Sequence, residues 1–313
     1  QIINNPKEDY TKALIAAAHI MPEELSSSYF ISSKTAPLIE VKDITAGYGK
    51  RQEMTAVENV NLTIESGETV GIIGESGSGK TTLGRIISGL MAPRSGVVML
   101  NGKPLHGHLA NRSRDELRDI QFAFQMADVA LNPRQKIEKI LGRPMLFYKN
   151  FSKKEVRFEV EKLLSRVELP ADFSNRYPTE LSGGQRQRVN LARALAAEPK
   201  LIICDEITSA LDTIVAQQIL DLLQSLQEEL GLSYLFITHN IATVAQISKK
   251  IAVMREGKII EQGFVEDVLT PPCHEYTQLL LNSVPEMRTD WLDNAVLERR
   301  QLLAELNRMQ GVE

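Results

Sequence analysis

A glycine-rich stretch that ends in lysine and threonine carries the strongest chemical signal in the sequence. Residues 74–81 read GESGSGKT, which fits the phosphate-loop pattern G-x-x-x-x-G-K-[ST]. Glycines let backbone N–H groups approach phosphate oxygens, and the helix that follows adds the positive end of its dipole. The pattern predicts that Lys80 reaches the β- and γ-phosphates of a nucleotide and that Thr81 binds Mg²⁺. The residues expected to contact the nucleotide here are Gly74, Ser76, Gly77, Ser78, Gly79, Lys80, Thr81 and Thr82.

Two adjacent carboxylates form the second candidate group. Asp205 and Glu206 follow the apolar run 201–204, which is typical of a buried strand. Carboxyl ends of parallel strands meet at one edge of a sheet, where ligands bind. We therefore expect Asp205 to hold Mg²⁺ and Glu206 to polarise the attacking water. Alone this signal is weak, because many buried strands end in an acidic residue.

A second possible anion-binding helix end precedes these carboxylates. Ser182, Gly183, Gly184 and Gln185 come just before a helical pattern that runs to residue 195. Free backbone N–H groups at the start of such a helix bind anions. The chain thus offers two phosphate-binding helix ends and one pair of carboxylates.

The pattern of apolar residues predicts the elements that position these motifs. From residue 38 onward, short apolar runs typical of strands alternate with helical patterns, and run 69–73 leads directly into the glycine-rich loop. This order predicts an α/β fold with a parallel sheet covered on both faces. Residues of about 126–190 are richer in helix and are predicted to be an insertion into that core.

Composition narrows the functional classes. The chain has 313 residues, of which 43% are hydrophobic and 24% charged, enough for a sizeable core and roughly two domains. Its 36 basic and 40 acidic residues give a net charge of −4, so it lacks the broad positive field that nucleic-acid binding needs. Two cysteines exclude a disulfide framework, and no apolar run approaches the length of about 18 residues typical of a membrane span.

With its motifs in this order, the chain resembles the ABC ATPases over residues 48–239. The resemblance implies that Tyr48 stacks on adenine and that His239 contacts the γ-phosphate. It further implies that Gln125 binds Mg²⁺ and joins the catalytic core to the helical subdomain, and that Asp212 lies in the loop 209–212 at the nucleotide. The catalytic residues would be Glu206, His239 and Gln125, with Thr81, Gln125 and Asp205 as metal ligands. Ile207, where relatives commonly have proline, departs from the pattern without replacing a group that touches nucleotide.

The resemblance also implies the fold and the cofactors. We expect a P-loop NTPase, RecA-like core with a parallel sheet, an N-terminal antiparallel β subdomain and an inserted α-helical subdomain at about 126–190. The predicted divisions are an ATPase domain over 38–268, a C-terminal extension over 269–313, and the end of a preceding module plus linker over 1–37. ATP and Mg²⁺ are the expected cofactors. Each nucleotide would lie between the phosphate loop of one module and the Ser-Gly-Gly helix end of a second module.

Two further stretches resemble one subfamily, the oligopeptide, dipeptide and nickel importer ATPases. They are LNPR at 131–134 and PCHEYTQLL at 272–280. This likeness implies import of peptides or related small solutes through two separate transmembrane permease subunits, with a solute-binding protein as an indirect partner. The chain would lie on the cytoplasmic face of the inner membrane. Met126 and Ala127 stand where relatives often have Asp-Pro, which leaves the details of coupling to the membrane partner open.

An internal repeat suggests a fused protein. Residues 6–15 resemble residues 272–281, at a spacing of about one ATPase module, and the sequence does not begin with Met. We therefore expect this chain to be the C-terminal half of a tandem ATPase whose natural partner is its own N-terminal half. A homodimer would replace that partner for the isolated chain. Coincidence over ten residues is the alternative.

Two other functions compete with import. A soluble ABC ATPase acting on ribosomes would need a long charged linker between its modules, but residues 20–37 are few and rich in serine. One acting on DNA would need a long coiled-coil insertion between the phosphate loop and the Ser-Gly-Gly motif, but the interval 82–181 is too short for it. A regulatory module that binds ATP without hydrolysing it is disfavoured by the presence of Glu206 and His239. The sequence does not identify the transported solute, because specificity for the solute would reside in the solute-binding protein and the permeases.

Overall fold

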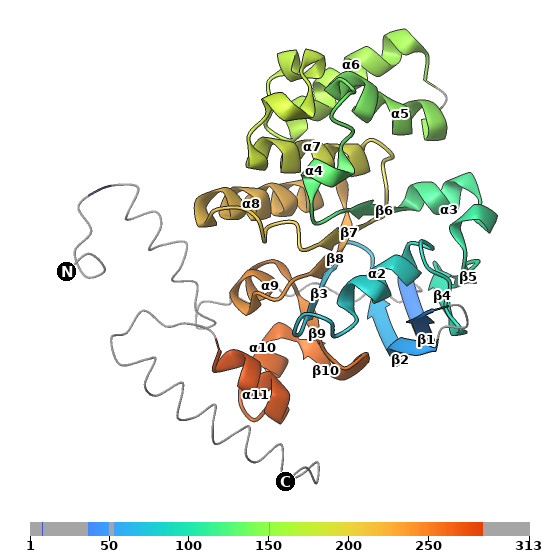
Figure 1. Cartoon of the computed structure of the whole chain (residues 1–313), viewed down its shortest axis with the longest axis vertical. Coiled ribbons are helices and arrows are strands. Elements are labelled where there is room, and N and C mark those ends of the chain that lie inside the picture. Colours follow the sequence, from blue (N-terminus) through green and yellow to red (C-terminus); the bar gives the residue numbers. More distant parts are fainter. Residues whose placement is uncertain (1–7, 9–36, 50–52, 150, 284–313) are drawn as a thin grey trace.

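A six-stranded sheet forms the centre of the molecule. The computed structural model describes residues 8, 37–49, 53–149 and 151–283. The sheet has the order β10-β9-β3-β8-β7-β6, and its neighbouring strands are parallel except for the antiparallel pair β9 and β10. Its strands are β3 (Thr69–Ile73), β6 (Ile120–Ala123), β7 (Leu201–Asp205), β8 (Ser233–Ile237), β9 (Lys250–Arg255) and β10 (Lys258–Phe264) (Figure 1). The predicted parallel sheet is confirmed.

A second, antiparallel sheet of order β2-β1-β4-β5 confirms the predicted N-terminal β subdomain. Its strands are β1 (Ile39–Tyr48), β2 (Met54–Ile64), β4 (Ser95–Leu100) and β5 (Lys103–Pro104). The turn between β4 and β5 consists of Asn101 and Gly102, with φ angles of 49° and 75°. Positive φ at both central residues is what a tight hairpin turn of this kind requires, and an Asn-Gly pair supplies it at low cost.

The two faces of the six-stranded sheet are covered differently. Side chains alternate along a strand, so Ile202 and Cys204 of β7 pack with the helices α7 (Gly183–Leu195), α8 (Thr213–Leu230) and α9 (Ile241–Ile247). Leu201 and Ile203 face the other way and pack with α2 (Lys80–Ile87) and the antiparallel sheet. The sheet is therefore covered on both faces, as predicted, but the second cover is one helix plus a sheet.

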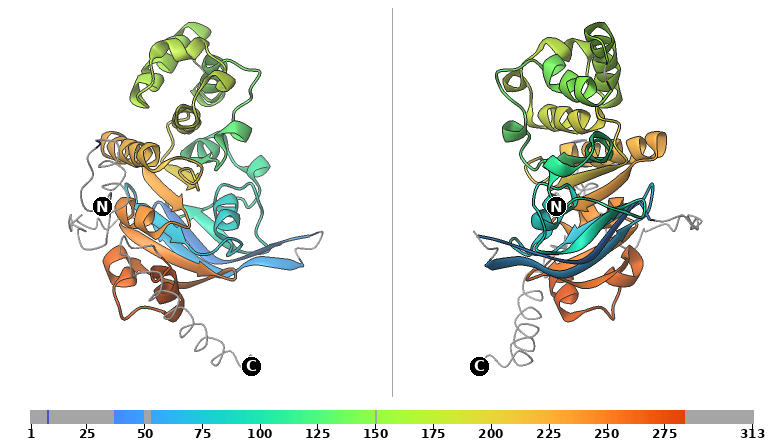
Figure 2. Two further views of the ribbon diagram at one scale, coloured as in Figure 1. Left: turned by 60° about the vertical axis from the view of Figure 1, so that its left-hand side comes forward. Right: turned by 90° about the vertical axis from the view of Figure 1, so that its right-hand side faces the viewer.

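A group of helices lies beyond one end of the central sheet. In both views of Figure 2 these helices, coloured green to yellow, sit at the opposite end from the antiparallel strands, coloured blue. The group comprises α4 (Ala127–Ala130), α5 (Ile137–Lys149), α6 (Lys153–Arg166), the 3₁₀ turns η3 (Ala171–Asn175) and η4 (Pro178–Glu180), and α7. A reciprocal capping box of Ser152 and Glu155 begins α6. This arrangement agrees with the predicted helical insertion.

The remaining described elements lie around the two sheets. They are η2 (Leu109–Asn111), α3 (Arg114–Asp119), α10 (Val265–Leu269) and α11 (Glu275–Leu281). Figure 1 shows α10 and α11 beside β9 and β10. Within the described ranges, no helix combines the length and the apolar character needed to cross a membrane.

Several predictions concern segments outside the described residues. These are the repeat at 6–15, nearly all of the preceding module and linker, and the end of the C-terminal extension. The domain boundaries themselves also stay predictions.

Candidate functional site

The glycine-rich loop connects the end of β3 to the start of α2. Gly74 and Gly79 have φ angles of 148° and 102°, and both are closely packed. A Cβ at Gly74 would overlap the carbonyl oxygen of Met254, and a Cβ at Gly79 would lie 2.5 Å from that of Ala56. Both positions therefore demand glycine for conformation and for space. At the tip of the loop, Ser76 and Gly77 are exposed, whereas Ser78 is buried.

The ammonium group of Lys80 lies inside this loop. Its Nζ donates to the carbonyl oxygens of Gly74 and Glu75, each at 2.7 Å, and the residue is only 5% exposed. Burial lowers the pKa of Lys80, against the opposing effect of the nearby Glu206, Asp205 and Glu75 charges. An ammonium group that is largely desolvated and held mainly by neutral carbonyls is a strong site for an anion.

Thr81 and Asp205 meet beside the loop. The Oγ1 of Thr81 donates to the Oδ1 of Asp205 at 2.9 Å, although 124 residues separate them. Burial raises the pKa of Asp205, its bond to Thr81 opposes this, and the charge of Glu206 raises the pKa further. A buried carboxylate next to a hydroxyl is a set of hard oxygen donors that suits Mg²⁺. These residues therefore fit the predicted metal site.

Glu206 is held from two sides. Gln125 Nε2 lies 2.7 Å from its Oε2, and His239 Nδ1 lies 3.3 Å from its Oε1. The residue has a φ of 47°, a left-handed conformation that is costly for glutamate. That conformation is fixed by neighbours, since the Glu206 N–H donates to Ile237 and its carbonyl accepts from Ser209. The structure thus brings the side chains of Gln125 and His239 together on the carboxylate of Glu206. The catalytic roles of the three residues stay predictions.

Tyr48 lies against the first turn of α2. Its hydroxyl forms a 2.9 Å hydrogen bond with the hydroxyl of Thr82, one residue after Thr81. The tyrosine is 44% exposed, so part of its ring is open to solvent beside the phosphate loop. Such an exposed ring is suited to stacking on a nucleotide base.

The Ser-Gly-Gly motif forms a separate site. Ser182 and Gln185 make a reciprocal capping box at the start of α7, at 3.3 and 2.9 Å, and Asp212 caps α8 by accepting from Val215 at 3.0 Å. Gly184 approaches Val215 closely. No hydrogen bond within the described residues joins Ser182, Gly183, Gly184, Gln185 or Asp212 to the phosphate loop.

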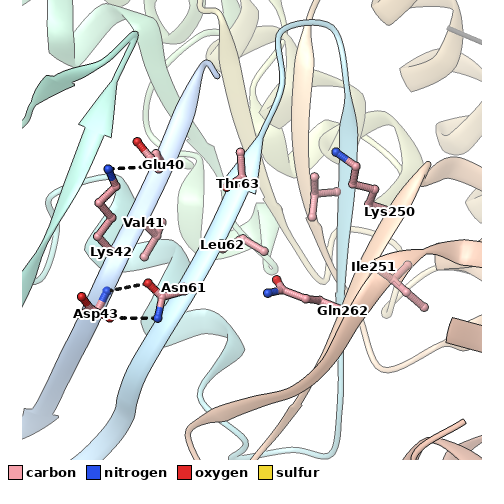
Figure 3. A pocket seen from close by; sticks show the side chains of 12 residues that line it. Glu40, Val41, Lys42, Asp43, Asn61, Leu62, Thr63, Lys250, Ile251 and Gln262 are labelled. Carbon is pink, nitrogen blue, oxygen red and sulfur yellow. Dashed lines mark hydrogen bonds and ion pairs between the residues drawn. The ribbon is translucent and has the colours of Figure 1, made fainter. Parts of the chain in front are cut away.

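A groove of about 480 Å³ lies elsewhere, between β1 and β2 on one side and β9 and β10 on the other (Figure 3). Several of the polar side chains that line the groove form hydrogen bonds or ion pairs with one another. Lys42 pairs with Glu40 at 3.0 Å, and Asn61 bonds to the backbone and carboxylate of Asp43. None of the predicted site residues lines it, so the groove is not the nucleotide site.

Asn190 is a positioning residue that the sequence analysis missed. It is fully buried in α7 and its Nδ2 donates to the carbonyl oxygen of Phe124 at 2.9 Å, next to Gln125. It therefore fixes the segment that carries Gln125 to the helical group. The signal in the sequence was weak, because the buried side chains of α7 also include the polar residues Gln187 and Arg188.

Comparison with known proteins identifies the family. The ABC transporter family profile matches residues 57–209, and the profile described as oligopeptide/dipeptide transporter, C-terminal region, matches residues 260–311. The oligopeptide transport ATP-binding protein OppF of Streptococcus pyogenes serotype M1 is 41% identical over 269 residues, which cover 85% of this chain and 86% of OppF. The chain belongs to the ABC transporter family of ATP-binding proteins. AmiF of Streptococcus pneumoniae serotype 4, of the same description, is 41% identical, over 85% of each chain.

Solved structures agree with this assignment. The protein cbiO1 of Clostridium perfringens, part of the ABC transporter complex cbiONQ, has a TM-score of 0.65 and 29% identity to this chain, and the match covers 74% of this chain and 90% of cbiO1. The ATP-binding cassette MJ0796 was solved as a dimer in a post-hydrolysis state with ADP and Pi. It has a TM-score of 0.64 and 35% identity to this chain, and the match covers 72% of this chain and 98% of MJ0796. The chain is therefore an ATPase with a P-loop NTPase fold. The alternative of a ribosome- or DNA-acting ATPase is not favoured.

Proposed function

We propose that this ABC ATPase powers the import of peptides or related small solutes through two separate membrane permeases. Its relatives OppF and AmiF are described as oligopeptide transport ATP-binding proteins. Residues 260–311 of this chain match the profile of the oligopeptide/dipeptide transporter C-terminal region. A solute-binding protein would deliver the solute to the permeases, and the ATPase would lie on the cytoplasmic face of the inner membrane.

The nucleotide site in this proposal uses the residues around the phosphate loop. Lys80 and the N–H groups of the glycine-rich loop would bind the phosphates, with Tyr48 stacked on the base. Thr81 and Asp205 would hold Mg²⁺, together with the Oε1 of Gln125, since the Nε2 of that amide donates to Glu206. When bound, Mg²⁺ neutralises phosphate charge as the bond to the γ-phosphate breaks.

Glu206 is the general base of the proposed hydrolysis, and its placement is the observation that carries the proposal. Its side chain is 20% exposed, so water can reach it, and both its oxygens have fixed neighbours. In this position the carboxylate would take a proton from the attacking water, and His239, which lies beside it, would contact the γ-phosphate. Gln125 keeps the base oriented. General-base catalysis of this kind contributes about 10²–10⁴-fold to a rate.

The active unit in this proposal is a head-to-tail pair of modules. Because Ser182 and its neighbours make no bond to the phosphate loop of their own chain, they are available to a nucleotide on another module. The second module would be the N-terminal half of a fused tandem chain, or a second copy of this chain. Binding energy from the shared nucleotide would then favour the closed pair.

An exposed apolar surface on the helical side supports docking to a permease. Val129 of α4 is 78% exposed, and Met126 and Phe124 just before it are also exposed. Exposed apolar side chains that cluster on a water-soluble face usually mark an interaction site. These residues flank Gln125, so contact with a permease would change the position of Gln125, which orients Glu206.

Transport by purified components tests the proposal. Proteoliposomes that contain the two permeases and this ATPase, loaded with ATP and Mg²⁺, should take up labelled oligopeptides when the solute-binding protein is added outside. The Glu206→Gln ATPase serves as the matched control and should abolish uptake. ATP hydrolysis without peptide uptake would contradict the proposed substrate class, and absence of hydrolysis would contradict the proposed site.

A further inference from the structure

Helix α11, the last described element of the chain, reaches the phosphate loop through one hydroxyl group. The Glu75 N–H, in the loop, donates to the hydroxyl oxygen of Tyr276 at 3.2 Å, and 201 residues separate the two. Tyr276 is 2% exposed, and Figure 1 shows α11 beside β9 and β10. None of the predicted catalytic or nucleotide-binding residues lies in this helix.

The position of the tyrosine ring is fixed by its surroundings. The guanidinium carbon of Arg255 lies 4.9 Å from the centre of the ring. The first turn of α11 is tied to β10, because Glu261 accepts from the His274 N–H at 3.1 Å and from the hydroxyl of Thr277. The phenol oxygen therefore has a position set by the docked helix rather than by a freely rotating side chain.

The amide that contacts Tyr276 belongs to the same peptide unit that holds Lys80. The carbonyl oxygen of Gly74, on the other side of this unit, accepts from Lys80 Nζ at 2.7 Å. A trans peptide is planar, so its N–H and C=O point in opposite directions and turn together. Fixing the Glu75 N–H therefore also fixes the carbonyl that holds the ammonium group of Lys80.

We propose that Tyr276 is a positioning residue for nucleotide binding, which acts by fixing the Gly74–Glu75 peptide and hence Lys80. The inference rests on the proposed nucleotide site and adds a residue of the C-terminal extension to it. A second bond supports the same side of the loop, since the Gly257 N–H, in the turn between β9 and β10, donates to Ser78 at 3.0 Å. Loss of the hydroxyl frees the peptide to rotate, so that ordering the loop becomes part of the cost of binding.

Tyr276→Phe tests the proposal because it removes one oxygen and keeps the ring. Tyr234→Phe is the matched control, since Tyr234 is fully buried and its hydroxyl donates to Leu223 at 3.1 Å, in the core on the helix side of the sheet. Calorimetric titration of the full chain with ADP avoids turnover. We expect the Kd for ADP to rise about three- to tenfold in Tyr276→Phe and to change less than about twofold in the control.

Amide exchange gives a second readout on the same proteins. The Glu75 amide should exchange faster in Tyr276→Phe than in the wild type or in Tyr234→Phe, because exchange follows local opening. Both variants lose a buried hydrogen bond and should melt at lower temperature, so a selective loss of ADP affinity cannot come from general destabilisation.

Each outcome of this experiment decides the proposal. Equal ADP affinities for the two variants, with unchanged exchange at Glu75, would overturn it. If Tyr276→Phe fails to fold, amide exchange in the wild type still tests the proposal. A Glu75 amide that exchanges as fast as an exposed loop amide would contradict its hydrogen bond to Tyr276 and overturn the proposal. A wild-type chain that binds no ADP would contradict the proposed function instead, and the exchange comparison would then decide the role of Tyr276.

Discussion

Gln125 donates from its Nε2 to the Oε2 of Glu206 at 2.7 Å, across 81 residues of sequence. Gln125 follows β6 and leads into the helical group, whereas Glu206 follows β7, the strand next to β6. The bond therefore joins the carboxylate at the end of the central sheet to the part of the chain that carries the exposed Val129. Movement of the helical group is expected to change the orientation of the base.

Glu206→Gln should abolish turnover and leave nucleotide binding intact. Glutamine keeps the shape of the side chain but cannot take a proton, so we expect hydrolysis to fall by about 10²–10⁴-fold. Phosphate release measures the rate, and an equilibrium titration with ATP measures binding. Glu198→Gln is the matched control, because Glu198 has a similar φ of 54° and its side chain pairs with Lys149 at the surface. Turnover within about tenfold of wild type would rule out Glu206 as the base.

Thr81→Val should weaken the affinity for Mg²⁺ and so raise the Mg²⁺ concentration that activity requires, whereas Thr81→Ser should leave both unchanged. Valine has the shape of threonine but removes the hydroxyl that bonds to Asp205 at 2.9 Å and that is proposed to bind the metal. Even changes to the groups that orient metal ligands cost about 10–100-fold in metal affinity, so losing a ligand should have at least this effect. Activity measured against Mg²⁺ concentration should shift accordingly for valine alone. Equal Mg²⁺ requirements for both variants would contradict the assignment.

Tyr48→Ala and Tyr48→Phe distinguish the contribution of the ring to ATP binding from that of its hydroxyl. If the ring stacks on the base, alanine should weaken ATP binding by about 1–3 kcal/mol, the usual range for one stacked base. Phenylalanine loses only the bond to Thr82 and should cost about 1 kcal/mol or less. Calorimetric titration with ATP and with GTP checks this, and the loss should be similar for both because stacking depends little on the base. Equal effects of the two substitutions would show that only the hydroxyl matters.

Two inactive variants should restore each other's activity if the site is shared between modules. Lys80→Ala disables the phosphate loop, and Gly183→Asp places a carboxylate where it repels phosphate while suiting the start of α7. Each variant alone should be inactive, whereas random pairing in a mixture should give about a quarter of wild-type activity. For the wild type, activity should also rise more than linearly with protein concentration. A mixture without activity, together with concentration-independent turnover by a monomer, would overturn the shared site.

The two cysteines should react very differently with iodoacetamide. Burial raises the pKa of the Cys204 thiol, with a further rise from the charge of Asp205, and the residue is fully buried. Burial and the charge of Glu261 also raise the pKa of Cys273, which is partly exposed. A raised pKa leaves less thiolate below it, so the labelling of Cys273 should keep increasing above pH 8.5, the ordinary value. Peptide mass spectrometry should find Cys204 labelled only after unfolding, and equal native rates would contradict its burial.

Local chemistry was readable from the sequence by itself. The phosphate loop, the capping boxes at Ser152 and Ser182 and the Asn101-Gly102 turn were all predictable, and the described structure contains each of them. The reason is that their causes lie within a few consecutive residues: the positive φ angles of a tight hairpin turn favour glycine or asparagine, and a capping side chain lies three residues from its partner. Helix α8 and its end at Gly231 follow from the same local logic.

Only the tertiary structure decided which distant groups meet. Strand β8 lies between β3 and β7, so the strand that leads into the phosphate loop is not a neighbour of the strand that ends in Asp205. Asp205 contacts Thr81 because Thr81 lies in the first turn of α2, which packs across the sheet. The same register brings His239 and Gln125 onto opposite oxygens of Glu206. The contact of Tyr276 with Glu75, and the packing of the antiparallel sheet beside α2, had no local signal at all. Such contacts depend on how whole elements pack, since the free energy of burying their faces is shared by residues far apart in the chain.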